Sequence, residues 1–347
     1  MAVDRVLLAA PRGFCAGVEM AIKALAWLVR SFPPPVYCYH EIVHNRLVVD
    51  RFERLGVVFV DDVAEVPAGR PLMLSAHGSA PEVVSQARLR GGYVVDAVCP
   101  LVTKVHHEVR VRAGKGFRVV YVGHEGHDEA VGTMAVAPES ISLVSEPADI
   151  DSLDDTDAPV AVLAQTTLSH RDWSDVADAA KARFGDVWMA GRSDLCFATT
   201  NRQGALEKIA PGCDTVVVIG SANSSNTMAL AKVAAESGCE RVLRVNAASE
   251  LPDNLFGTVG VTAGASAPEE LVEAVIAKLA PQDGTTEVTI TDEDEYFPPP
   301  RELRDLLSAM EAAVHATLAV APSARVSAAD RTTAASDVLA GLASAAS

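Results

Sequence analysis

The sequence predicts an α/β protein with mainly parallel sheets, built from three tandem units around a central cavity. Three observations support this fold class. Short apolar runs alternate with helical patterns along the chain, three cysteines stand where such a run gives way to a helical pattern, and polar clusters follow each cysteine at similar distances. Alternating strands and helices are typical of βαβ units and parallel sheets.

The polar clusters recur at two nearly constant offsets from Cys15, Cys99 and Cys196. The first cluster follows after 29, 28 and 28 residues, at His44, His127 and Ser224. The second follows after 62, 67 and 70 residues, at His77, Thr166 and Ser266. Ligands of open α/β sheets bind outside the carboxyl ends of the strands. We therefore expect a pseudo-threefold arrangement in which these strand-end loops share one site.

The strands expected in each unit follow the apolar runs. The first unit, 1–90, has strands over 5–9, 36–39, 57–60 and 71–74; the second, 91–184, over 93–95, 118–122, 141–144 and 160–163. The third, 185–281, has them over 187–189, 216–219, 242–245 and 258–261. Residues 282–304 are expected to form a closing strand and an extended arm. Residues 305–347, rich in Ala and Ser, form a helix or a disordered tail.

Composition excludes several classes of function. The net charge of −17 and pI near 4.9 argue against binding to nucleic acid, whose phosphates attract basic surfaces. The apolar runs are too short to span a membrane, and the first residues lack the layout of a signal peptide, so we expect a cytoplasmic protein. In that compartment, six cysteines indicate core thiols, metal ligands or redox groups rather than disulfides.

The three repeated cysteines are candidate metal ligands. Each would lie at the positive end of a helix, which lowers the pKa of a thiol, and thiolates bind soft metals and iron-sulfur clusters. Three cysteines on a cubane cluster would leave one iron without a protein ligand, open to substrate. A zinc site of three cysteines and one histidine is an alternative, although the close cysteine pairs of zinc motifs are absent. Buried core thiols are the other alternative.

The groups at the repeated offsets suit a diphosphate held without a clamp of Lys or Arg. They are histidines in the first two units and hydroxyls or amides elsewhere: His44, His77, His127, Thr166, Ser224, Ser225, Asn226 and Ser266. The segment 224–226 is also typical of a helix N-cap, and helix N-termini bind anions. Glu129 is the carboxylate best placed as an acid, with Glu125, Asp128 and Glu41 as competitors; burial would raise its pKa.

From Val6 to Arg304 the chain resembles the 4-hydroxy-3-methylbut-2-enyl diphosphate reductase family, the iron-sulfur enzymes that end the non-mevalonate (methylerythritol phosphate) route to isoprenoids. The resemblance rests on Pro-Arg-Gly-Phe-Cys-Ala-Gly-Val at 11–18, His-Asn-Arg at 44–46, Ser-Ala-His-Gly at 75–78, Cys-Pro-Leu-Val-Thr-Lys-Val-His at 99–106, Gln-Thr-Thr-Leu-Ser at 165–169, Ala-Thr-Thr-Asn-Arg-Gln at 198–203 and Val-Thr-Ala-Gly-Ala-Ser-Ala-Pro at 261–268. The Glu-Gly-Thr-Met motif of the family is replaced here by Ala-Val-Gly-Thr-Met at 130–134. Three departures are Asp128 where the family often has proline, Ala164 where threonine is common, and the extra tail rich in Ala and Ser.

The resemblance implies one 4Fe–4S cluster per chain on Cys15, Cys99 and Cys196, with one open iron that binds the substrate oxygen. It implies contacts to the diphosphate and hydroxyl of the substrate from His44, His77, His127, Thr166, Ser224, Ser225, Asn226 and Ser266. Glu129 is implied as the proton donor, assisted by Thr166 and His127. The reaction takes two electrons and two protons, releases water and yields isopentenyl and dimethylallyl diphosphate. A ferredoxin or flavodoxin is implied as the electron donor.

Two other functions explain part of this pattern. An iron-sulfur sensor or carrier explains the cysteines but leaves the repeated histidines and hydroxyls without a role. A zinc hydrolase is disfavoured because the sequence lacks clustered His and carboxylate ligands at the usual spacing.

Overall fold

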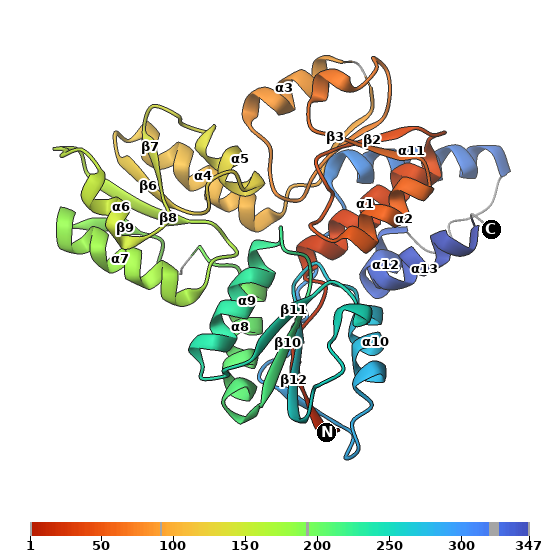
Figure 1. Cartoon of the computed structure of the whole chain (residues 1–347). Coiled ribbons are helices and arrows are strands. Elements are labelled where there is room, and N and C mark those ends of the chain that lie inside the picture. The colour runs from red at the N-terminus through yellow and green to blue at the C-terminus, as the bar shows by residue number, and fades with distance from the viewer. Residues whose placement is uncertain (1, 91, 192–193, 319–325, 346–347) are drawn as a thin grey trace. The chain divides into compact units, whose positions relative to one another are not determined.

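The computed structural model describes residues 2–90, 92–191, 194–318 and 326–345 (Figure 1). The chain forms two compact units. The large unit comprises Met1–Cys15 and Leu101–Asp294, and the small unit comprises Ala16–Pro100 and Glu295–Ser347. Three sheets are present among the described residues, and every strand pairing in them is parallel. The α/β class with parallel sheets is therefore confirmed.

The five-stranded sheet of the large unit has the order β11-β10-β12-β1-β13. Its strands are β1 (Val3–Ala10), β10 (Thr215–Ile219), β11 (Val242–Val245), β12 (Gly257–Ala263) and β13 (Thr285–Thr289). The helices α8 (Phe197–Ile209) and α9 (Ser225–Glu236) pack on one face and α10 (Glu269–Leu279) on the other (Figure 1). Because both faces are covered, β10 is apolar in nearly every position.

The second sheet of the large unit has the order β7-β6-β8-β9. Its strands are β6 (Arg118–Val122), β7 (Ile141–Val144), β8 (Val160–Ala164) and β9 (Val187–Met189). The helices α4 (Pro100–Gly114) and α5 (Asp128–Met134) cover one face, and α6 (Pro147–Ser152) and α7 (His170–Phe184) cover the other. Val120 and Val122 face one side while Val119 and Tyr121 face the other, as the two-residue period of a strand requires.

The small unit contains the sheet β3-β2-β4-β5. Its strands are β2 (Val36–Tyr39), β3 (Val57–Val60), β4 (Leu72–Leu74) and β5 (Val94–Asp96). Its helices are α1 (Ala16–Ser31), α2 (Arg46–Arg54), α3 (Pro81–Leu89), α11 (Arg301–Leu318), α12 (Val326–Thr332) and α13 (Ala335–Ala345). The side chain of Asn45 accepts a hydrogen bond from Val48 N at 3.3 Å and thereby caps α2.

The sheets do not coincide with the predicted units of sequence, which are called blocks here. Each predicted strand lies within two residues of an observed one at either end. The strands before Cys99 and Cys196 pair with strands of the preceding block, whereas the strand before Cys15 pairs with strands near the other end of the chain. β5 pairs with β4, β9 pairs with β8, and β1 pairs with β12 and β13. The chain therefore leaves one sheet and enters the next at each cysteine. The five predicted domain ranges and the pseudo-threefold arrangement stay predictions.

The C-terminal helices pack on α1 within the small unit. Lys23 of α1 is buried, and its ammonium donates hydrogen bonds to Asp330 O at 2.9 Å and Thr333 O at 3.2 Å. Ala335 N donates to Glu19 Oε2 at 2.8 Å. Leu339 and Leu342 of α13 are also buried. Among the described residues, no helix is long and apolar enough to cross a membrane.

We expect Leu339→Ala to destabilise the protein, since this side chain is 1% exposed. Removing a buried leucine costs about 2–5 kcal/mol of unfolding free energy, whereas a surface substitution changes it by about 0.5 kcal/mol or less. Met310→Ala on α11, where Met310 is 43% exposed, is the matched control. Thermal and denaturant unfolding measure both variants. Equal stability of the two would show that α13 does not dock on the folded chain.

Candidate functional site

The polar clusters of the large unit follow the carboxyl ends of its strands. His127 and Glu129 follow β6, Thr166 follows β8, the Ser224–Asn226 segment follows β10, and Ser266 follows β12. The two cysteines of this unit occupy equivalent places, with Cys15 after β1 and Cys196 after β9. The parallel pairing explains why the chain delivers them to the same ends of the sheets.

Glu129 and Thr166 form the most tightly connected pair of the site. The Glu129 side chain is buried, at 2% exposure, and accepts hydrogen bonds on both oxygens. Thr166 N donates to Oε1 at 2.7 Å, and the Thr166 hydroxyl donates to Oε2 at 2.8 Å. The carboxyl group is thus held in one orientation by a neighbouring strand end.

Burial raises the pKa of Glu129 to about 7, and the negative charge of Asp194 adds to the rise while the two Thr166 hydrogen bonds oppose it. Desolvation penalises the charged form of a carboxyl group more than these hydrogen bonds stabilise it here. Burial likewise raises the pKa of Asp194 to about 6, against the lowering effect of Lys104. Glu129 can therefore hold a proton near neutral pH, as expected from the sequence. Of its competitors, Glu125 is exposed and Asp128 and Glu41 are half-buried.

His127 caps the helix that carries Glu129. Its Nδ1 accepts a hydrogen bond from Glu129 N at 3.2 Å, so the ring proton of the neutral imidazole lies on Nε2. This tautomer leaves Nε2–H as a donor and ties the position of the histidine to that of the acid.

Arg202 ties the loop of Cys15 to the helix that starts after Cys196. It is fully buried on α8, and its guanidinium donates to Gly13 O at 2.8 and 3.1 Å and to Ala198 O at 2.9 Å. Glu293 accepts from it on both carboxylate oxygens, at 2.9 and 3.0 Å. A planar guanidinium suits this fork of acceptors in a way that a lysine does not.

A chain of hydrogen bonds also connects the two cysteine loops. Thr199 Oγ1 lies 3.0 Å from Cys196 Sγ and accepts from Asn226 Nδ2 at 3.4 Å. Asn226 Oδ1 accepts from Ala265 N at 2.9 Å, and Ala265 O accepts from Cys15 N at 3.2 Å. Asn226, expected from the sequence to contact the substrate, thus also connects Cys15 to Cys196.

The expectation of a lowered thiol pKa is wrong for Cys196. Burial, together with the nearby Cys15, raises its pKa to about 12, although Thr199 and Arg202 act in the opposite direction. Such a thiol is a poor nucleophile, because the thiolate is the reactive form. A metal ion deprotonates a coordinating thiol outright, so the environment of Cys196 suits a metal ligand better than a nucleophile.

The N-terminus of α9 lies close to the ends of two strands. A Cβ on Gly220, after β10, or on Gly264, after β12, would approach Thr227 Oγ1 to 2.3 Å, so glycine is required at both positions. Ser224 Oγ accepts from Thr227 N at 3.3 Å and caps the helix. Ser225 Oγ accepts from Gln165 Nε2 at 3.0 Å, which connects the ends of β8 and β10. Ser266, two residues after Gly264, is buried.

The small unit positions the other three predicted residues. His44 precedes α2 and His77 follows β4, and their rings stack with centroids 3.9 Å apart and planes 10° apart. His44 Nδ1 lies 3.5 Å from Glu41 Oε2. Cys99 is half-buried and lies directly before α4, and its N–H donates to Ala76 O at 3.0 Å, one residue before His77. Within this unit, the hydrogen bond to Ala76 therefore connects Cys99 to the loop that carries His77, whose ring stacks on His44.

The sequence interpretation missed Arg202 and Asp194 as parts of the site. Arg202 lies inside the Ala-Thr-Thr-Asn-Arg-Gln motif, but only the fold shows its contacts with Gly13 and Glu293. Asp194 is buried, accepts from Ala164 N at 3.3 Å, and lies 3.6 Å from Lys104 Nζ. An acidic residue two positions before Cys196 was the available signal for it.

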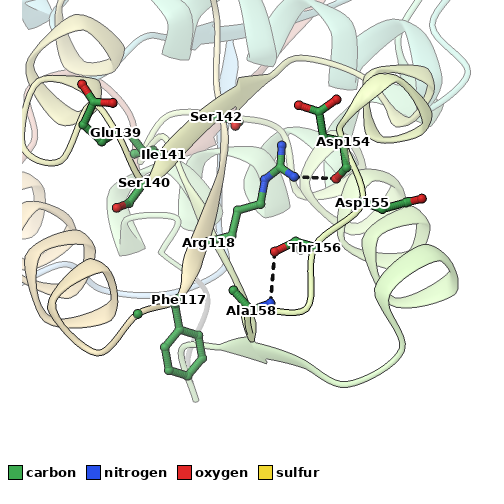
Figure 2. Close-up of a pocket in the computed structure, with 11 residues that line it drawn as sticks. Phe117, Arg118, Glu139, Ser140, Ile141, Ser142, Asp154, Asp155, Thr156 and Ala158 are labelled. Atoms are coloured by element: carbon green, nitrogen blue, oxygen red, sulfur yellow. Dashed lines mark hydrogen bonds between the residues drawn. The ribbon is translucent and has the colours of Figure 1, made fainter.

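A surface pocket of about 460 Å³ lies at the opposite ends of β6 and β7 (Figure 2). It is lined by Arg118, Glu139, Asp154, Asp155 and Thr156 among others, and Arg118 Nη1 donates to Asp154 O. None of the predicted site residues lines this pocket. Because β6 and β7 begin here, this pocket is separate from the carboxyl-end site.

Comparison with known proteins relates the whole arrangement to one family. Residues 6–280 match the family model described as LytB protein. A 4-hydroxy-3-methylbut-2-enyl diphosphate reductase of Rhodopirellula baltica is 44% identical over 315 residues, which cover 89% of this chain and 98% of that protein. A protein of the same name from Leifsonia xyli is 45% identical over 306 residues, covering 86% and 91% of the two chains.

The solved structures that resemble this chain are reductases of the same kind as its sequence relatives. The E-1-hydroxy-2-methyl-but-2-enyl-4-diphosphate reductase from Plasmodium falciparum superimposes with a TM-score of 0.85 at 30% identity, covering 90% of this chain and 100% of that one. A structure of (E)-4-hydroxy-3-methyl-but-2-enyl diphosphate reductase, described as the terminal enzyme of the non-mevalonate pathway, gives a TM-score of 0.58 at 30% identity over 80% and 99% of the two chains. The extent of these matches, together with the parallel-sheet fold, shows that this chain belongs to the LytB protein family.

Proposed function

We propose that this protein is an iron-sulfur oxidoreductase that reduces (E)-4-hydroxy-3-methylbut-2-enyl diphosphate to isopentenyl diphosphate and dimethylallyl diphosphate, the last step of the methylerythritol phosphate pathway. The allylic C–O bond breaks, two electrons and two protons are taken up, and the hydroxyl oxygen leaves as water. The identity of 44% with reductases across nearly their whole length supports this assignment.

The observation that carries the chemistry is the buried pair of Glu129 and Thr166. A hydroxyl group leaves readily only when it is protonated, so the site needs an acid that holds its proton at neutral pH. Glu129 has a pKa raised to about 7 by burial, and Thr166 orients its carboxyl group through two hydrogen bonds. Glu129 delivers the proton and Thr166 passes it to, or positions, the leaving oxygen. An iron-sulfur carrier has no need of this acid.

Cys15, Cys99 and Cys196 are the proposed ligands of a single 4Fe–4S cluster with one iron lacking a protein ligand. All three are half-buried cysteines at the starts of helices, and soft sulfur donors of this kind suit iron-sulfur clusters. When bound, the cluster supplies electrons to the substrate and a Lewis-acid iron for its oxygen. We also propose a location in the cytoplasm, where thiols are kept reduced and able to bind metal.

The diphosphate is proposed to bind the neutral donors of both units. In the large unit, Ser224, Ser225, Asn226 and Ser266 lie at strand ends or at the N-terminus of α9, where backbone N–H groups attract anions. His44 and His77 are the proposed donors of the small unit. His127, whose Nδ1 caps the helix that carries Glu129, is proposed to contact the substrate close to this acid.

The test is turnover by anaerobically purified protein with a reduced viologen as electron source. We expect the substrate to be consumed and both five-carbon diphosphates to form, each identified by mass spectrometry and NMR.

Since Glu129 acts as an acid with a pKa near 7, the rate should fall as the pH rises through this value. Thr166→Val removes a hydrogen bond that stabilises the carboxylate, so the fall should move to higher pH. Absence of both products would refute the proposed reaction.

A further inference from the structure

The proposed reaction takes up two electrons in each turnover, so a reductant must reach the protein. The following inference rests on that proposed function. The chain has 46 acidic and 29 basic residues, a net charge of −17, and therefore repels acidic proteins on average. A protein that delivers electrons and is itself acidic needs a local surface of the opposite sign.

The helix α4 and its continuation provide such a surface. Residues 100–118 contain five cationic side chains and a single carboxylate, Glu108, whose Oε2 is 3.1 Å from Arg112 Nη2. The five are Lys104, Arg110, Arg112, Lys115 and Arg118. This segment therefore has a positive charge within a strongly negative chain.

Three of these cations point to solvent. Val102, Val105 and Val109 are buried, so at 100° per residue the opposite half of the helix is the exposed half. Lys104 and Arg110 fall on that exposed half, Lys115 directly follows the last residue of the helix, and all three are exposed. We call these three residues the α4 cationic face. Arg112 instead lies over the ring of Trp188 at 3.7 Å, and Arg118 bonds to Asp154 O in the pocket of Figure 2.

Few carboxylates form ion pairs with the α4 cationic face in the part of the chain that the structure describes. Lys104 Nζ lies 3.6 Å from Asp194 Oδ1, while the lysine side chain keeps 45% exposure. In the part of the chain that the structure describes, no ion pair involves Arg110 or Lys115. The acidic residues Asp154 and Asp155 line the pocket beyond the far end of α4 and bound the positive surface there.

The position of this helix along the chain matters as much as its charge. Cys99, a proposed cluster ligand, directly precedes Pro100, the first residue of α4. Lys104 lies about one turn into the helix, and at 1.5 Å per residue Lys115 lies only about 22 Å from its start. A partner seated on this face would dock along the helix that carries a ligand of the redox centre.

We infer that the α4 cationic face is the docking surface for an acidic one-electron carrier protein that reduces the enzyme. Opposite charges would steer the encounter and orient the carrier toward the Cys99 end of α4. An extended polyanion such as nucleic acid would run beyond this short face onto the acidic remainder of the surface. The carrier gives up one electron in each of two encounters, which balances the two electrons that the substrate takes up.

The test reverses two charges of this face in the holoenzyme, Arg110→Glu with Lys115→Glu, and leaves Lys104 beside Asp194 untouched. The matched control, Arg171→Glu with Lys208→Glu, makes the same change in net charge on exposed residues of α7 and α8. Binding of a purified acidic ferredoxin is measured directly at several salt concentrations. Turnover is measured with this ferredoxin and, separately, with a reduced viologen.

We expect the α4 variant to bind the ferredoxin about tenfold more weakly or worse, with a smaller salt dependence. Its viologen-driven turnover should equal that of the unaltered protein, and the control should lose less than about twofold in binding. Unchanged ferredoxin binding by the α4 variant would overturn the inference, as would an equal loss in the control or a loss of viologen-driven turnover. Viologen-driven turnover of the unaltered protein tests the proposed function separately, because ferredoxin binding is measured without turnover.

Discussion

Glu129→Gln is expected to reduce kcat by about 10²–10⁴-fold, the usual contribution of a positioned general acid. The glutamine keeps the size of the side chain and a carbonyl oxygen for the hydrogen bond from Thr166 N, so the local fold should persist. It cannot release a proton to the leaving oxygen. Steady-state turnover and iron content measure the result. The variant should retain its iron and its KM while it loses turnover.

The matched control for this variant is Glu125→Gln, in the loop directly before α5 and exposed to solvent. It removes the same charge without touching Thr166, and we expect its kcat to change by less than about twofold. The pH dependence gives a second check, because the fall in rate near pH 7 should be absent from the residual activity of Glu129→Gln. Normal turnover by this variant would assign the acid role to another residue.

Arg202→Met is expected to cause the largest loss of stability of any substitution discussed here. It leaves Gly13 O and Ala198 O without their guanidinium partner, and it leaves Glu293, with 14% side-chain exposure, without its counter-ion. Breaking a buried ion pair from one side costs about 3–5 kcal/mol. Because the contact with Gly13 holds the loop before Cys15, the variant should also retain less iron. Denaturant unfolding and iron analysis measure the two effects.

Two further variants separate the loss of charge from the loss of geometry. Arg202→Lys keeps the charge but not the fork of donors, so it should recover part of the stability and little of the iron retention. Arg241→Met, which removes exposed hydrogen bonds to Asn254 in the same unit, should change stability by about 0.5 kcal/mol or less. Wild-type stability of Arg202→Met would show that Arg202 does not join the cysteine loops.

Much of the fold could be predicted because buried parallel strands leave a strong local signal. β8 and β10 are short apolar runs that end at polar clusters, and the chain repeats this pattern at the offsets that start from Cys15, Cys99 and Cys196. The pairing of β1 with β12 and β13 could not be predicted in this way. It depends on contacts between residues at opposite ends of the chain, which periodicity does not encode.

The residues of the site that follow strand ends could be predicted as well, whereas their burial and their distant contacts could not. The offsets identified His127 and Thr166 near strand ends, and Glu129 was selected because it follows His127 by two residues. The structure places Glu129 and Thr166 in direct contact. The pKa of Cys196 was expected to fall, because the sequence shows that a helix follows but does not show that the thiol is buried. Arg202 was missed for the same reason, since its role depends on acceptors such as Glu293, which lies 91 residues away in the chain.

The most direct test of the proposed cluster is an iron and sulfide count for six single Cys→Ser variants purified without oxygen. The unaltered protein should be brown and contain about four irons per chain. Serine at Cys15, Cys99 or Cys196 should remove most of this iron. Serine at Cys38, Cys213 or Cys239, the other free cysteines, should leave it in place. A full cluster in any of the first three variants, or a colourless protein that holds zinc and keeps its activity, would contradict the account.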